Sequence, residues 1–219
     1  MSSRETILAR VRAALADVPA DERPQDVPAP RDYRPTHTPD DPAALLDLLH
    51  TNLADYRARV HRTGPDLLPA LIAGLLAAHG SRSVAVPAGL PAAWLAGTEV
   101  EQVHESADMT PRQLEAVDSV VTGCTLAIAE TGTVVLDAGP GQGRRILTLV
   151  PDHHICVVHS PRQVLASLPQ AMPRLDPARP QTWISGPSAT SDIELDRVEG
   201  VHGPRTLDDI LVTGSRLSG

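Results

Sequence analysis

The sequence predicts an α/β fold, a three-layer sandwich in which a mostly parallel sheet lies between helical layers. Short β-rich runs alternate with helical patterns after residue 80, the order typical of such folds. Some runs, such as 155–158, are apolar on both faces, which suits strands covered on both sides. The 219 residues, 42% of them hydrophobic, are enough to bury one large core.

The first 40 residues predict an N-terminal helix and a Pro-rich arm. Ser2 and Glu5 have capping-box spacing, and apolar residues then recur at helical intervals over 3–17. From 19 to 42 the chain is dense in Pro and charge, as in a linker or a surface arm. We therefore expect the α/β domain to occupy 41–219.

Two helices are predicted at the start of this domain. Asp41 is a good N-cap before Pro42, and the apolar residues that follow on one face are Leu45, Leu49, Leu53, Tyr56 and Val60. A second helix over 66–79 ends at Gly80, a natural residue after a helix C-terminus.

Eight β-rich runs and three further helical patterns follow. The predicted strands are 83–87, 99–104, 117–122, 133–138, 146–150, 155–159, 182–185 and 209–212, and the helical patterns are 90–96, 110–116 and 161–172. The Gly-rich run 139–143 predicts a hairpin between 133–138 and 146–150, and the two Arg that follow it can steady an anion.

Composition excludes several functions. A net charge of −8 and only four aromatic residues argue against a nucleic-acid partner. All 19 basic residues are Arg, so a Schiff-base lysine and a lysine-containing phosphate loop are excluded. Cys124 and Cys156 cannot supply the four ligands of an iron–sulfur cluster. The histidines at 153, 154 and 159 match no zinc spacing, so we expect no metal site.

We expect a cytoplasmic protein that does not insert into a membrane. The first 18 residues are charged and amphipathic, unlike a secretory signal. The longest apolar run, 67–78, contains Pro69 and is too short to span a bilayer.

The segment 122–133 is the first candidate site. Glu130 can serve as a general base, a nucleophile or a hydrogen-bond acceptor, and we expect such loops at the carboxyl ends of strands. The alternative is that Glu130 only caps or pairs with an Arg. The candidate ligand-binding residues are Thr122, Gly123, Thr131, Gly132 and Thr133.

The segment 185–204 is the second candidate. A Gly-Pro turn leads into hydroxyl residues and a capping-box pattern, and such a helix start can hold an anion. Capping explains part of this pattern, but not the density of hydroxyl groups. The candidate ligand-binding residues are Ser185, Gly186, Ser188, Thr190 and Asp192, and His202 on its Gly-rich turn is a candidate catalytic residue alongside Glu130.

Four stretches together carry a family resemblance: AIAETGTVVLD, GRRILTLVPDHHICVV, ISGPSATSDIE and VEGVHGP. In order and spacing they resemble the LUD-domain family over about 40–213. The resemblance implies a fold related to the glucosamine-phosphate isomerase, ribose-phosphate isomerase and CoA-transferase group. It also implies a component of L-lactate utilization, the oxidation of lactate to pyruvate, whose iron–sulfur clusters are on partner proteins and not on this chain.

Three hypotheses follow from the residues and the resemblance. In the first, the chain is a lactate-utilization component that binds a small carboxylate or its partner proteins. In the second, it is an independent enzyme of CoA-transferase or isomerase type that uses Glu130, because Glu130-Thr131-Gly132 is similar to the Glu-x-Gly turn of CoA-transferases. The absent lysine argues against the isomerase chemistry. In the third, residues 1–40 form a docking arm of an assembly factor.

Overall fold

The computed structural model describes residues 2–19, 21–23, 34–38, 41–190, 198–199 and 203–214. The chain divides into two compact units, Met1–Arg34 and Pro35–Gly219. In the first unit, helix α1 (Ser3–Ala14) confirms the predicted N-terminal helix and capping box. The backbone amide of Ser2 donates to Glu5 over 2.6 Å, and the amide of Glu5 donates to the Ser2 hydroxyl over 3.3 Å. No residue of α1 is buried.

A six-stranded sheet forms the centre of the second unit. Its strands are β1 (Arg59–Thr63), β2 (Ser83–Val86), β3 (Glu101–His104), β4 (Ser119–Gly123), β7 (His153–His159) and β12 (Thr206–Val212). They lie in the order β1-β12-β7-β4-β2-β3, and every neighbouring pair is parallel. The prediction of an α/β fold on a mostly parallel sheet is therefore confirmed.

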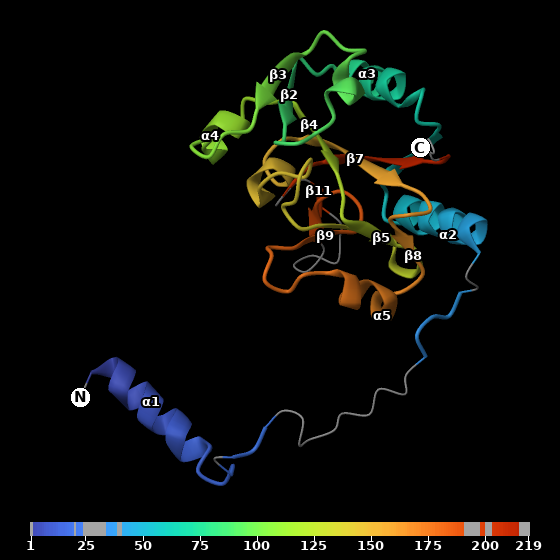
Figure 1. Cartoon of the computed structure of the whole chain (residues 1–219). Coiled ribbons are helices and arrows are strands. Elements are labelled where there is room, and N and C mark those ends of the chain that lie inside the picture. Colours follow the sequence, from blue (N-terminus) through green and yellow to red (C-terminus); the bar gives the residue numbers. More distant parts are fainter. Residues whose placement is uncertain are drawn as a thin grey trace. The chain divides into compact units, whose positions relative to one another are not determined.

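Two helices cover opposite faces of this sheet (Figure 1). Helix α2 (Pro42–Asp55) begins at the predicted cap, where the Asp41 carboxylate accepts from the two backbone amides of Ala43 and Ala44. Helix α3 (Leu68–His79) ends at Gly80, whose φ of 74° is left-handed. Successive side chains of each strand point to opposite faces of the sheet. Each helix therefore packs on a separate buried apolar cluster.

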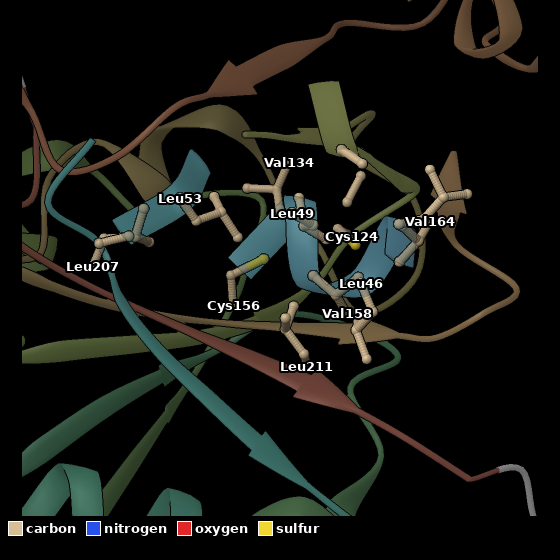
Figure 2. Packing of buried hydrophobic residues seen from close by; sticks show 14 of the residues in the cluster. Leu46, Leu49, Leu53, Cys124, Val134, Cys156, Val158, Val164, Leu207 and Leu211 are labelled. Atoms are coloured by element: carbon tan, nitrogen blue, oxygen red, sulfur yellow. The ribbon is translucent and has the colours of Figure 1, made fainter. Parts of the chain in front are cut away.

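A second, four-stranded sheet lies on the α2 side (Figure 1) and was not predicted. It is composed of β8 (Val164–Leu165), β5 (Leu126–Ile128), β6 (Thr133–Leu136) and β9 (Thr182–Ile184). Figure 2 shows the shared core, in which Leu49 and Leu53 of α2 lie among Val134 of β6 and Cys156 of β7. Helix α5 (Leu168–Ala171) covers the other face of this sheet. The small sheet and α2 thus share one core with the large sheet.

The remaining elements are short: η2 (Ala92–Leu95), α4 (Pro111–Leu114), η3 (Ala129–Thr131), η4 (Arg145–Thr148), η5 (Met172–Arg174), β10 (Ala189–Thr190) and β11 (Val198–Glu199). Strands β10 and β11 pair antiparallel. None of the helices in the described ranges has both the length and the apolar character needed to cross a membrane.

The hairpin predicted between 133–138 and 146–150 is wrong. Strand β6 pairs antiparallel with β5 and β9, and residues 145–148 form η4 instead of a strand. After β6 the Gly-rich run turns away from the small sheet toward the loop that follows β2, where the amide of Gly141 donates to the Ala88 carbonyl over 2.8 Å. Arg144 then donates to Glu105 over 2.9 Å, which directs the chain toward β3.

Two helical predictions are also corrected. Val60, expected on the face of α2, lies in β1, because the chain leaves the helix at Arg57 with a left-handed φ of 70°. The helical pattern over 161–172 is divided between β8 and α5. In both places, apolar residues at helical spacing belong to a short strand. Periodicity alone does not distinguish a short apolar strand from a helical segment.

The second unit begins at Pro35, six residues before the expected domain boundary at 41. The Ser167 hydroxyl donates to the Pro35 carbonyl, and Glu130 accepts hydrogen bonds from residues 36–38. These contacts attach the end of the Pro-rich segment to the α/β unit.

Candidate functional site

A cavity of about 520 Å³ lies between the two sheets. One side is β9 with the segment 185–188, and the other is η4 with the amino-terminal ends of β7 and β12. His154 and Leu207, the second residues of β7 and β12, line it side by side in register. The sequence predicts a site at the carboxyl ends of the strands, whereas this cavity is at the amino-terminal ends of β7 and β12.

Arg145 gives the cavity a positive charge. Its side chain is exposed and forms no hydrogen bond or ion pair with any residue in the described ranges. No carboxylate is among the described residues that line the cavity. A guanidinium group pairs well with a carboxylate, so this cavity suits a small anion.

Hydroxyl groups from the two predicted segments form a hydrogen-bonded chain whose last member, Ser185, reaches the same cavity. Ser185 lines it, and its Oγ is 2.8 Å from Oγ1 of Thr133, which is 2.8 Å from Oγ1 of Thr131. Gly186 and Ser188 also line the cavity, and the Ser188 amide donates to the Pro204 carbonyl over 2.9 Å. The structure therefore brings together hydroxyls from both predicted segments.

His154 is a buried, neutral side chain of the cavity wall. Burial, with the charge of His153 as a smaller cause, lowers the pKa of His154 to about 3. Its Nε2 lies 2.8 Å from the Thr122 hydroxyl. His154 can thus exchange hydrogen bonds with a ligand, but it does not add a positive charge near neutral pH.

Glu130 lies outside the lining of this cavity. Its Oε1 accepts from the His37 amide over 2.7 Å and from the hydroxyls of Thr36 and Thr38 over 3.1 and 3.2 Å. Burial raises the pKa of Glu130, but these hydrogen bonds outweigh it and the pKa lies below its ordinary value. Glu130 is thus a carboxylate that binds the segment before α2, and its catalytic role stays a prediction.

The other predicted residues lie in several places. Gly123 ends β4, and its amide donates to the Gly141 carbonyl over 2.8 Å. Gly132 has a left-handed φ of 56° and lies against Asn52 of α2. Thr190 is part of β10, but its side chain is outside the described set. Asp192 and His202 lie outside the described residues.

A second cavity, about 460 Å³, lies at the carboxyl ends of β2 and β3 and is lined by Gly89, Glu105, Gly139 and Arg144, among others. Its arginine is already bound within the protein: Arg144 donates to the Glu105 carboxylate and to the backbone carbonyls of residues 106, 107 and 109. Since this cation is already neutralised, the first cavity is the better anion site.

The sequence pattern predicted no role for His154, and for Arg145 only an anion contact as one of two arginines after a Gly-rich run. The pair of arginines after a Gly-rich run was an available signal for Arg145. Its neighbours in the cavity, residues 181–188, are more than 30 positions away, and only the fold brings them together. No group of three or more His, Cys, Asp or Glu in the described part of the chain is arranged to hold a metal ion.

Comparison with known proteins gives consistent results. A model of the LUD domain matches residues 47–212. The chain is 41% identical over 197 residues to "Lactate utilization protein C" of Deinococcus radiodurans, which covers 88% of this chain and 89% of that protein. It is 34% identical over 110 residues to the protein of the same name from Halalkalibacterium halodurans, covering 46% of each.

A solved structure supports the same grouping. The crystal structure of a DUF162 family protein from Deinococcus radiodurans is 36% identical and superimposes with a TM-score of 0.68, covering 80% of this chain and all of that one. The family match covers most of the α/β unit, including every described residue that lines the candidate cavity. This chain belongs to the LUD domain family.

Proposed function

We propose that this protein is a component of an L-lactate utilization system and binds a small carboxylate, such as a 2-hydroxy acid, in the cavity between the two sheets. The observation that carries the binding proposal is the Arg145 side chain, which has no partner among the described residues, in the same cavity as Ser185 and Ser188. The relatives named for lactate utilization support lactate as the carboxylate.

The chemistry of the cavity matches the functional groups of lactate. A guanidinium group can bind a carboxylate through two parallel hydrogen bonds. The hydroxyls of Ser185 and Ser188, together with neutral His154, can exchange hydrogen bonds with a 2-hydroxy group. The volume of about 520 Å³ lies in the usual range for small-molecule sites, about 300–1,000 Å³.

Oxidation of lactate to pyruvate removes two electrons, which need an acceptor. The two cysteines of this chain cannot ligate an iron–sulfur cluster. The proposal therefore assigns the redox centres to iron–sulfur partner proteins and gives this chain the binding of the carboxylate or of those partners. It also includes a cytoplasmic location, which cell fractionation tests. No observation favours the alternative of an independent transferase or isomerase that uses Glu130.

The test is L-lactate oxidation in cells that lack this chain, complemented with wild type, Arg145→Gln or Arg82→Gln. Arg82 is a matched control because its side chain is 89% exposed and lines neither cavity. We expect wild type and Arg82→Gln to restore oxidation, and Arg145→Gln to fail at equal abundance. If Arg145→Gln restores oxidation fully, the cavity is not the working site. If cells that lack this chain oxidise L-lactate as fast as wild-type cells, the proposed role in lactate utilization is wrong.

A further inference from the structure

A separate pocket of about 270 Å³ is lined by three arginines, Arg57, Arg59 and Arg205, with Pro187, Thr206 and Leu207. No carboxylate is among the described residues that line it. This concentration of positive charge occurs in a chain whose net charge is −8. Guanidinium groups brought together repel one another, and a bound anion relieves that repulsion.

Strand ends and a helix end position these side chains. Arg59 is the first residue of β1 and lies in register with Asp208 of β12. Thr206 is the first residue of β12 and Arg205 directly precedes it, so two of the arginines lie at the starts of neighbouring parallel strands. Arg57 follows α2 in the left-handed turn that ends the helix. The pocket is therefore built on the scaffold of the sheet rather than on a long loop.

The arginines are not equally neutralised. Arg205 donates to the Asp152 carboxylate through Nε over 2.6 Å and through Nη2 over 3.1 Å. Arg59 forms no hydrogen bond or ion pair with any residue in the described ranges. Burial is the largest cause that lowers the pKa of His79, and the charge of Arg59 is a smaller one. Arg59 thus retains a full set of donors for a ligand.

The arginine pocket adjoins the candidate cavity, because Pro187 and Leu207 line both. The candidate cavity also contains Arg145. Two guanidinium groups without described partners therefore lie in adjoining spaces. This arrangement suits either two separate anions or one ligand with an anionic group at each end.

We propose that the arginine pocket binds a phosphate group, either as inorganic phosphate or as the phosphate end of a small ester whose remainder lies in the neighbouring cavity. Several guanidinium groups and the Thr206 hydroxyl can donate to the oxygens of a tetrahedral dianion from more than one direction. A carboxylate has only two oxygens and uses such a set less completely. This site is additional to the proposed lactate role and does not depend on it.

The experiment is calorimetric titration of the purified full-length protein with inorganic phosphate and with 3-phosphoglycerate, in a buffer without phosphate. We expect Arg59→Gln to weaken the binding of both ligands by about tenfold or more, since charge-assisted hydrogen bonds are lost. The control Arg82→Gln is expected to match wild type. Circular dichroism checks that each variant is folded. If Arg59→Gln does not fold, Arg57→Gln takes its place in the experiment.

The Arg145→Gln variant identifies the source of the phosphate. If 3-phosphoglycerate binds more tightly than phosphate and Arg145→Gln removes this difference, the site takes the phosphate end of a larger ligand. If the two ligands bind equally and Arg145→Gln has no effect, it takes free phosphate. Absence of phosphate binding up to about 10 mM, or equal affinity of wild type and the folded arginine-pocket variant, overturns the proposal. Neither result affects the lactate role, because lactate is not involved.

Discussion

At the scale of residues, the neighbouring aspartates Asp208 and Asp209 of β12 have opposite protonation behaviour. The Asp208 carboxylate accepts from His61 over 2.6 Å and from His153 over 2.9 Å. Burial raises the pKa of Asp208, but these hydrogen bonds outweigh it and lower the pKa to about 2. On the other side of the His153 ring, Nδ1 lies 2.9 Å from the Ser119 hydroxyl, so Ser119, His153 and Asp208 form one buried chain of hydrogen bonds.

Asp209 points to the other face, as strand alternation requires. Both of its carboxyl oxygens are buried without a hydrogen-bond partner among the described residues. Burial, together with the charge of Asp208, raises the pKa of Asp209 to about 8. Its register partner Cys156 follows the cavity-lining His154 by two residues, so a protonated carboxyl lies one layer below the cavity wall.

This raised pKa predicts a pH dependence of stability. The folded-state pKa of Asp209, about 8, is above the ordinary value of 3.8, so the folded state keeps a proton that the unfolded chain releases. Stability should fall as pH rises from about 4 to about 8. We expect Asp209→Asn to increase the free energy of unfolding at pH 8 by more than about 1 kcal/mol, with a smaller gain near pH 4.

Urea unfolding at pH 4, 6 and 8 measures this effect, with the exposed Asp55→Asn as control. The burial of Asp209 is contradicted if both variants follow the pH profile of wild type in parallel.

At the scale of elements, the C-terminal half of α2 positions both polar segments. Asn52 donates to the Ala129 carbonyl over 2.7 Å, and a Cβ on Gly132 would lie 2.7 Å from the Asn52 carbonyl carbon. A Cβ on Gly186 would lie 2.2 Å from the Tyr56 carbonyl oxygen. These glycines allow the backbones of the two loops to approach the helix, which sets the cavity wall at 185–188.

Substitution of these glycines should have graded effects. Gly186 and Gly80 both have left-handed φ, 83° and 74°, but a Cβ at Gly80 meets nothing within 4 Å. We expect Gly80→Ala to lower the free energy of unfolding by about 1 kcal/mol and Gly186→Ala by about 3 kcal/mol, because only the second adds a clash with backbone. Thermal and urea unfolding measure both, and equal losses would contradict the close approach of residue 186 to α2.

Glu130 is expected to anchor the segment 36–38. Glu130→Ala removes the acceptor of three hydrogen bonds, so we expect hydrogen exchange at the His37 amide to accelerate by about tenfold, and less in Glu130→Gln, which keeps a carbonyl oxygen. Exposed Glu115→Gln is the control. A catalytic Glu130 predicts the reverse pattern: Glu130→Gln would abolish lactate oxidation while exchange at His37 changes little.

At the scale of the whole molecule, the sequence predicted the parallel sheet and the helices with clear caps, Asp41 at α2 and Gly80 at α3. These are local signals. Two strands of the small sheet, β6 and β9, coincide with predicted strands, but β5 and β8 were missed because three and two residues are too few for a periodic pattern. Without them the separate sheet could not be predicted. The hairpin after β6 was wrong because its partner β5 precedes β6 through the 3-10 turn η3 rather than following the Gly-rich run.

The candidate site was predictable in part. Ser185, Gly186 and Ser188 were identified from hydroxyl and glycine density, and the structure places all three on the cavity. His154 of β7 lies in register with Leu207 of β12, and both line the same cavity as Arg145 of η4 and the residues of β9, elements that are far apart in the sequence. Such long-range pairing leaves no local pattern in a single sequence.

The most direct test of the central claim, that the cavity with Arg145 binds a small carboxylate, is calorimetric titration of L-lactate into the purified protein. Wild type, Arg145→Gln and Arg82→Gln are compared at constant pH and ionic strength. The account predicts that wild type and Arg82→Gln bind alike and that Arg145→Gln binds at least about tenfold more weakly, because a charge-assisted hydrogen bond is lost. Equal binding by all three variants, or no binding by wild type, would contradict it.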